Sequence, residues 1–359
     1  MSAVNATADE TSWMLYGAYG YTGTLIAREC LRQGLRPVLA GRSEARLAPL
    51  AAELGLEQRT FALEDRATLA TRLRDIRLVL NCAGPFAATA AAMMDACMAA
   101  GAHYLDISGE IDVLEHAQTL SEAAARAGTI ICPGVGFDVI ATDCVAATLA
   151  ATMPDATQLA LGFDSRSGLS AGTAKTTLRR LAVGGAIREN GRIVTVPLAS
   201  RTRRIDFGNG EKLAMCIPWG DVATAWYTTG IANIEVYVPA SPRLVSRLRL
   251  LSRLRPLLRL APVQALAGAW IARALRGPDA TERARTPMHV WGEARNQAGA
   301  TCTARLVVAN GYDLTVSGAL AVTRALLAQT RPGGSYTPSR LMGADFVCTL
   351  PGSSGVRIE

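Results

Sequence analysis

The sequence is poor in lysine and histidine and has no long apolar run. These shortages argue against a histidine metal site and against a membrane span. Its only lysines are Lys175 and Lys212, and its three histidines have no spacing typical of a metal site. The eight cysteines form no C-x-x-C pair, which indicates reduced, mostly buried thiols of a cytoplasmic protein. No stretch of about 18 uncharged apolar residues occurs, so we expect no membrane span.

Acidic residues are missing from one segment, between Glu235 and Asp279. Eight arginines fall there, and their charge exceeds the formal net charge of the whole chain, +7. The basic character therefore belongs to this one segment, which argues against a nucleic-acid partner. Pro256 and Pro262 interrupt the pattern, which does not predict an amphipathic membrane helix. Three interpretations of residues 243–276 stay open: solvated helices at a domain or subunit surface, contact with an acyl carrier or an anionic membrane surface, or no assigned role.

The most informative feature that is present is MLYGAYGYTG at residues 14–23, followed by TLIARECLRQG. An apolar strand, a glycine-rich turn and a helix are predicted in succession, and this arrangement directs backbone N–H groups at a pyrophosphate. The spacing departs from G-x-G-x-x-G, so the context carries the prediction. The expected cofactor contacts in this loop are Gly17, Tyr19, Gly20, Tyr21, Thr22 and Gly23.

The end of the second predicted strand, residues 36–40, indicates which dinucleotide binds. No acid follows it at the place where an NAD-binding unit presents a carboxylate to the ribose 2′-hydroxyl. Arg42 and Ser43 stand there instead, and a guanidinium can pair with a 2′-phosphate. Glu44 is the rival ribose ligand, although the helix dipole also explains a carboxylate in a first turn. The pattern favours NADP(H) over NAD(H).

Strand and helix signals alternate through residues 13–150, which predicts a doubly wound parallel sheet of the Rossmann type. Ligands of such sheets bind beyond the carboxyl ends of the strands, so three strand-end loops are expected at the cofactor: 81–86, 106–110 and 132–138. A purely structural turn is the alternative for the first loop. The cofactor contacts predicted in it are Asn81, Cys82, Ala83, Gly84 and Pro85.

The other two loops carry acids whose roles stay open. Asp106 and Glu110 can position a substrate, or Ser108 can simply cap the helix that starts near residue 111. Asp138 is expected to cap the helix of residues 139–150, and a role beside the nicotinamide or the substrate is the other interpretation.

Five motifs occur in order along the first part of the chain: GAYGYTG, AGRSEARL, NCAGPF, YLDISGE and CPGVGFDVIATD. In this order and spacing they resemble the saccharopine dehydrogenase-like oxidoreductases, in particular the branch that includes trans-acting enoyl reductases. The similarity continues at residues 170–181, 277–286, 290–299 and 335–346, so it covers nearly the whole chain. It implies an NADP-dependent oxidoreductase.

The resemblance also implies a division into domains. After a disordered tail at residues 1–12, it implies an NADP-binding domain at 13–150, a substrate and dimerisation domain at 151–330, and a C-terminal segment, 331–359, that returns to the first domain. After residues 153–155 the pattern changes to longer strands with fewer helices, which predicts a second α/β domain on a mostly antiparallel sheet. As in relatives, we expect a homodimer.

Two chemistries fit the resemblance. Enzymes that make saccharopine need cationic anchors for an amino-dicarboxylate, and no motif here identifies such anchors. Enoyl reductases accept apolar chains, which suits the tryptophans of the second half, although core packing also explains them. The hypothesis is hydride transfer from NADPH to a C=C or C=N bond of an apolar, free or carrier-bound substrate. The alternatives are a saccharopine-type imine dehydrogenase and a noncatalytic, lipid-associated NADP-binding scaffold.

The proton donor of such a reaction has no motif. No tyrosine is followed four positions later by lysine, so the acid arrangement of short-chain dehydrogenases is missing. Lys175 and Asp138 are the two catalytic candidates, with a solvated lysine and a helix cap as the structural alternatives. The histidines, His289 among them, are interpreted as incidental.

Overall fold

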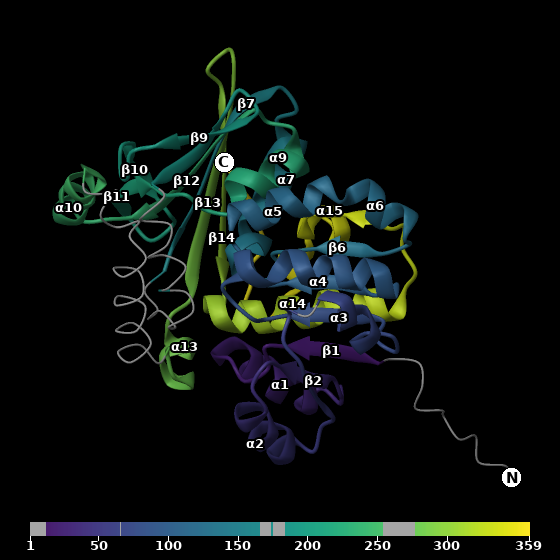
Figure 1. Ribbon diagram of the computed structural model, residues 1–359. Coiled ribbons are helices and arrows are strands. Elements are labelled where there is room, and N and C mark those ends of the chain that lie inside the picture. The colour runs from purple at the N-terminus through teal and green to yellow at the C-terminus, as the bar shows by residue number, and fades with distance from the viewer. Residues whose placement is uncertain (1–11, 65, 166–173, 175–183, 254–276) are drawn as a thin grey trace, which may run out of the picture.

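The computed structural model describes residues 12–64, 66–165, 174, 184–253 and 277–359. Figure 1 shows two sheets with their helices, one sheet built from the N-terminal half and the other from the middle of the chain. The predicted tail at residues 1–12 lies outside the described residues except for Ser12. In the described ranges no helix combines the length and apolar character needed to cross a membrane.

The first sheet has seven strands in the order β15-β6-β5-β4-β1-β2-β3, and all neighbours are parallel. Strands β1, β2 and β4 carry only buried residues, as expected for a parallel sheet with helices on both faces. The predicted Rossmann-type sheet is therefore confirmed. Its first elements are β1 (Trp13–Tyr16), α1 (Tyr21–Arg32), β2 (Val38–Gly41), α2 (Glu44–Leu54), β3 (Gln58–Thr60), α3 (Arg66–Arg72), β4 (Leu78–Asn81), α4 (Phe86–Ala100), β5 (His103–Asp106), α5 (Ile111–Thr119), α6 (Ser121–Arg126) and β6 (Ile130–Cys132).

The second sheet has nine strands, seven of them in the order β10-β11-β12-β7-β13-β14-β16, with β8 beside β12 and β9 beside β8. Among the strands that the structure describes in this sheet, only β7 and β12 pair in parallel, so the predicted mostly antiparallel sheet is confirmed. Its elements are β7 (Ala156–Asp164), β8 (Gly185–Glu189), β9 (Arg192–Val196), β10 (Thr202–Asp206), β11 (Glu211–Cys216), α9 (Asp221–Thr229), β12 (Asn233–Pro239), α10 (Pro242–Arg253), α13 (Ala280–Arg285), β13 (Met288–Asn296) and β14 (Thr301–Val308).

Helix α7 (Phe137–Thr152) joins the two sheets. It follows β6 of the first sheet and packs against β7, β13 and β14 of the second. Its residues are apolar on nearly all sides, which is typical of a helix buried between two layers. At Gly292 of β13, an added Cβ would come within 2.6 Å of Val145 and 2.8 Å of Leu149. The backbone of β13 is therefore in direct contact with side chains of α7.

The C-terminal part of the chain divides between the two sheets. Helix α14 (Gly311–Ala328) packs against α1, α7, β4 and β5, and β15 (Gly334–Ser335) extends the first sheet beside β6. Helix α15 (Pro338–Met342) packs on α7, a 3₁₀ turn follows at Phe346–Thr349, and β16 (Arg357–Ile358) pairs with β14 of the second sheet. The return to the first sheet thus begins at α14, before residue 331, and the domain limits stay a prediction.

We expect Gly292→Ala to destabilise the protein by about 1–3 kcal/mol, because the new methyl group overlaps Val145 and Leu149 and forces α7 away from β13. Urea unfolding measures the change. Gly355→Ala is the matched control, since a Cβ there meets nothing within 4 Å. Equal stability of the two variants would contradict this account of the packing.

Candidate functional site

The glycine-rich turn after β1 lies directly on the loop after β4. Gly17 has φ +78°, and a Cβ on it would stand 2.7 Å from the backbone nitrogen of Ala83. A Cβ on Gly23 would overlap the carbonyl oxygen of Gly17. Neither position accepts a side chain without moving backbone, so these glycines bring the turn, α1 and the β4 loop together.

The N-terminus of α1 is open to an anion. Gly20 is the N-cap, no side chain in the described part of the chain caps it, and the first turn contains no acid. The N–H groups of Tyr21, Thr22 and Gly23 stand at the positive end of the helix dipole. These are the residues that can hold the pyrophosphate of a dinucleotide, as predicted for this loop.

Two arginines surround the place expected for the adenosine end. Arg42 is exposed directly after β2, and Ser43 is the N-cap of α2. The ring of Tyr19 lies against Gly41, where a Cβ would be 2.5 Å from Cε1, and the guanidinium carbon of Arg46 is 4.5 Å from the centre of that ring. The sequence motifs did not indicate Arg46, which lies four residues after Arg42 in AGRSEARL.

Asn81 shapes the loop that follows β4. Its side chain is fully buried, its Oδ1 accepts from the N–H of Ala83 (3.0 Å), and its Nδ2 donates to the hydroxyl groups of Tyr104 and Thr89 (3.3 Å each). Burial raises the pKa of the neighbouring Cys82 thiol. The other predicted cofactor contacts in this loop are Ala83, Gly84 and Pro85, and their role stays a prediction. The Gly84–Pro85 peptide bond is cis.

Asp106 connects the three strand-end loops. Its Oδ1 accepts from the N–H groups of Ser108 (2.8 Å) and Gly134 (2.9 Å), and its Oδ2 accepts from the hydroxyl of Tyr104 (2.7 Å), which itself receives the Asn81 amide. The carboxyl is fully buried, and the loss of solvation raises its pKa to about 6. Asp106 is therefore a structural group and is not available to a substrate.

The capping role predicted for Ser108 is wrong. The N-cap of α5 is Glu110, and Ser108 is buried with its Oγ accepting from the Glu110 N–H (3.0 Å). The Glu110 carboxylate points the other way and accepts from the first N–H groups of α4, at Phe86 (3.0 Å) and Ala87 (2.9 Å). An acid from one strand-end loop thus stabilises the helix that follows another.

The capping role predicted for Asp138 is also wrong, because α7 begins at Phe137, two residues before the predicted start at residue 139. Gly136 is the N-cap, and Thr315 of α14 accepts from the Phe137 N–H (3.0 Å) in place of a local cap. The Asp138 side chain lies against Gly109 of the β5 loop, where a Cβ would be 2.7 Å from Oδ2, and its carbonyl accepts from the Trp219 indole (2.9 Å). Asp138 therefore lies between the cofactor edge and the second sheet.

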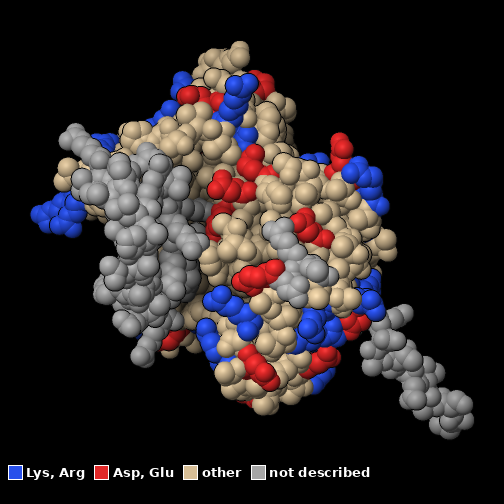
Figure 2. Space-filling model, viewed as in Figure 1, with Lys and Arg blue, Asp and Glu red and all other residues tan. Residues whose placement is uncertain are grey.

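Two other predictions concern residues that are described only in part. Lys175, the second catalytic candidate, lies outside the described residues. Of the arginine-rich segment 243–276 the structure describes 243–253, which form α10. Leu244 and Leu250 are 42% and 60% exposed there, and Figure 2 shows basic side chains at the left edge of the molecule, where Figure 1 places α10.

Residues 13–132 match the family model described as the saccharopine dehydrogenase NADP binding domain. The similarity to that family lies in residues 13–132, which include strands β1 to β6. The match confirms both the resemblance drawn from the motifs and the predicted cofactor, NADP(H). The glycine turn, the open α1 terminus and the two arginines of this saccharopine dehydrogenase-type domain fit that cofactor.

Similarity to whole proteins is weaker. A saccharopine dehydrogenase-like oxidoreductase of Homo sapiens is 32% identical over 150 residues, which cover 36% of this chain and 35% of the relative. A trans-acting enoyl reductase of Mycobacterium tuberculosis is 29% identical over 206 residues, which cover 53% and 49%. The matched part thus spans between about a third and a half of these relatives' lengths.

One solved structure shares the fold over nearly the whole chain. It is apo saccharopine dehydrogenase (L-Glu forming) from Saccharomyces cerevisiae, with a TM-score of 0.63 and 11% sequence identity, covering 97% of this chain and 99% of that one. The fold of this chain is therefore similar to that of the yeast protein.

We expect Arg42→Ala to weaken NADPH binding by about 10- to 100-fold and NADH binding by less than about threefold, because only NADPH carries the 2′-phosphate. Calorimetric titration with both coenzymes measures the difference. Arg32→Ala, which removes an arginine that is 78% exposed at the far end of α1, serves as the control. An equal loss for both coenzymes would place the 2′-phosphate elsewhere.

We expect the stability to fall as the pH rises from about 4 to about 6.5. The folded Asp106 carboxyl keeps its proton to about pH 6, whereas the ordinary pKa is 3.8, so its contribution is complete below pH 3.8 and is lost above pH 6. Asp106→Asn, which still accepts from Ser108 and Gly134, reduces this fall by up to roughly 3 kcal/mol.

Urea unfolding at several pH values tests this dependence. Burial also raises the pKa of Asp143 and Asp221, so the wild-type slope has other contributors and the difference between variants is the quantity to compare. The exposed Asp95→Asn is the control and leaves the slope unchanged. An Asp106→Asn slope equal to the wild-type slope would refute the assignment.

Proposed function

We propose that the protein is an NADPH-dependent reductase that transfers hydride to a C=C or C=N bond of an apolar, free or carrier-bound substrate. The observation that carries the proposal is a row of aromatic rings beside the cofactor edge. Phe137, the first residue of α7, stands 5.2 Å from Phe163 of β7, which stands 4.9 Å from Trp219, measured between ring centres.

Apolar surface beside a nicotinamide suits the reduction of a carbon chain. Phe137 and Phe163 are almost fully buried and Trp219 is partly exposed, so the row leads from the core to the surface. Such a row excludes water from the reacting carbon and packs against acyl carbons. The relatives named trans-acting enoyl reductase support the same chemistry for this chain.

In this proposal, separate residues of the chain bind the coenzyme and transfer the proton. The N–H groups at the start of α1 hold the pyrophosphate, and Arg42 and Arg46 hold the 2′-phosphate. NADPH supplies the hydride when it is bound. Asp138, at the start of α7 beside Gly109 and Trp219, is the proposed proton donor to the atom that gains charge.

The assembly of the protein stays a prediction. The second sheet is the surface proposed for a homodimer. Exposed leucines and arginines of α10 are the described part of the surface proposed to meet an acyl carrier or an anionic membrane.

The function is tested by following NADPH fluorescence with enoyl thioesters, cyclic imines and oxo acids. We expect oxidation with an enoyl thioester or a cyclic imine. Asp138→Asn should lower kcat by about 100-fold with unchanged NADPH affinity, because proton transfer is lost and coenzyme binding is not. Asp112→Asn, an exposed acid of α5, is the control. Absence of NADPH binding, or no oxidation with any acceptor class, would reject the proposed function.

A further inference from the structure

The first turn of α1 is in contact with a segment that comes from far along the chain. Tyr21 is the first residue of α1, and its backbone N–H is one of the donors expected to bind the pyrophosphate. Its ring lies against Gly277, where a Cβ would stand 2.8 Å from Cε2, and its hydroxyl donates to the carbonyl of Pro278 (2.5 Å). Figure 1 shows α13, which follows these two residues, close to α1. Residues 277–286 are called the docked segment below.

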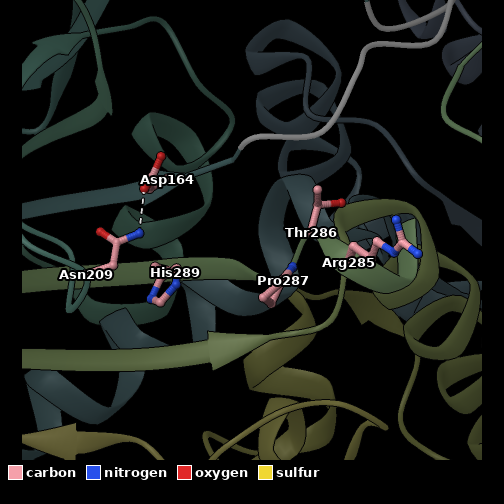
Figure 3. Close-up of a pocket in the computed structure, with 6 residues that line it drawn as sticks. All are labelled: Asp164, Asn209, Arg285, Thr286, Pro287 and His289. Carbon is pink, nitrogen blue, oxygen red and sulfur yellow. Dashed lines mark hydrogen bonds between the residues drawn. The ribbon is translucent and has the colours of Figure 1, made fainter. Parts of the chain in front are cut away.

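The docked segment leads directly into the second sheet. Figure 3 shows its last residues, Arg285 and Thr286, which with Pro287 line a pocket of about 260 Å³ together with Asp164, Asn209 and His289. Strand β13 begins at Met288. The residues that contact Tyr21 precede this pocket wall, so the pyrophosphate turn contacts the chain just before it enters the second sheet.

Arg283 of α13 holds the docked segment and Tyr21 together. Its Nη1 donates to the Tyr21 hydroxyl (3.2 Å) and to the Pro278 carbonyl (3.2 Å), and its Nε donates to Asp313 of α14 (2.8 Å). The Arg283 side chain is only 14% exposed. A planar guanidinium keeps its donors in fixed directions, so Arg283 orients the Tyr21 hydroxyl relative to both neighbours. Because Asp313 pairs with its charge, Arg283 acts here by position rather than as an unpaired cation.

The start of α14 contacts Tyr21 and the docked segment. The Tyr21 ring stands 4.9 Å from the ring of Tyr312, edge to face. Asn310, the N-cap of α14, is 2% exposed, and its Nδ2 donates to Thr286 Oγ1 (2.8 Å). The Arg283 and Thr286 contacts therefore hold the docked segment on α14 while Tyr312 packs on the coenzyme side.

The same turn of α14 contacts the start of α7. A Cβ on Gly311 would stand 3.2 Å from Cγ of Phe137, and Thr315 Oγ1 accepts from the Phe137 N–H (3.0 Å). Asp138, the proposed proton donor, is the next residue. The start of α14 thus lies between the pyrophosphate turn and the start of α7, and the docked segment is attached to it.

We propose that Arg283 is a positioning residue for NADP(H). Through Tyr21 it fixes the first turn of α1 in the orientation that binds the pyrophosphate, and coenzyme binding in turn stabilises the contact of the docked segment with that turn. The two effects are reciprocal, because a contact that favours bound coenzyme is itself favoured when the coenzyme binds. This role depends on the coenzyme alone and goes beyond the reaction proposed above.

Calorimetric titration of the full chain with NADP⁺ tests the effect on the coenzyme. We expect Arg283→Ala and Tyr21→Phe each to raise the Kd for NADP⁺ by about three- to tenfold. The double variant should bind within about twofold of the weaker single variant, because both changes remove the same contact. Multiplied effects in the double variant would show that the two residues act separately, and would overturn the proposal.

Arg324→Ala is the matched control for Arg283→Ala. This exposed arginine also belongs to a contact with α1, since it donates from α14 to the carbonyl of Gln33 at the other end of that helix (3.3 Å). We expect its Kd for NADP⁺ to equal that of the wild type. Urea unfolding without coenzyme is measured on all variants, because a merely structural contact lowers stability and leaves the Kd unchanged. An Arg283→Ala variant with that behaviour overturns the proposal.

Arg283→Lys separates position from charge. Lysine keeps the positive charge, but its single ammonium group lacks the planar fork that spans Asp313, Tyr21 and Pro278. We expect its Kd for NADP⁺ to lie close to that of Arg283→Ala. Full wild-type affinity in Arg283→Lys would mean that the charge alone acts, and would overturn the positioning role.

Hydrogen exchange tests the reverse effect. In the wild type NADP⁺ should slow exchange of the α13 amides by about threefold or more, and in Tyr21→Phe this slowing should disappear. Helix α6 is the control segment, since it also has six residues and packs on β6 and β15. Tyr336→Phe is the control variant, since its hydroxyl also donates to a backbone carbonyl, that of Pro332 (3.0 Å). Equal slowing in the wild type and Tyr21→Phe, or none in either, overturns the coupling.

Failure of this proposal is distinct from failure of the proposed function. Oxidation of NADPH by an enoyl thioester, together with an unchanged Kd in Arg283→Ala, leaves the reductase standing and rejects the positioning role. A raised Kd in Arg283→Ala without oxidation of any acceptor supports the positioning role and rejects the reductase.

Discussion

The buried carboxyl of Asp106 is the group on which the cofactor edge of this protein depends. It accepts hydrogen bonds from the loop after β5, from the loop after β6 and, through Tyr104 and Asn81, from the loop after β4. Three loops that are far apart in the chain are thereby held at one edge. Because the group is buried, its charge is disfavoured and its pKa is raised, while the hydrogen bonds from Ser108, Tyr104 and Gly134 favour the ionised form and offset part of that rise.

A second constraint is the burial of α7 between the sheets. The helix begins at the cofactor edge and packs along β7 and β13, so its position fixes the distance between the NADP-binding edge and the second sheet. Gly292 allows this close contact. Together with the Tyr21 and Arg283 contacts, α7 connects the two sheets both through the core and at the surface.

The sequence was most reliable where a short segment determines its own structure. The strand, turn and helix around Gly17 and Gly20 follow from local apolar patterning and glycine chemistry, and the Arg42 position follows from its place after β2. Prediction failed where a partner came from far along the chain. Asp138 does not cap α7 because Thr315, 178 residues away in sequence, satisfies the Phe137 N–H. The first N–H groups of α4 likewise donate to a distant group, the carboxylate of Glu110, which lies 24 residues after Phe86 in the sequence.

Sequence alone determined the Rossmann-type sheet, the family resemblance and the NADP cofactor, because all three depend on residues within one βα unit or on the order of such units. Tertiary structure alone decided that Asp106 is a buried connector, that Arg46 stands over Tyr19, and that His289, which carries no motif, lines a pocket with Arg285. The physical reason is that hydrogen bonding and burial at these sites are set by groups from separate strands and helices, which only the packed chain brings within contact distance.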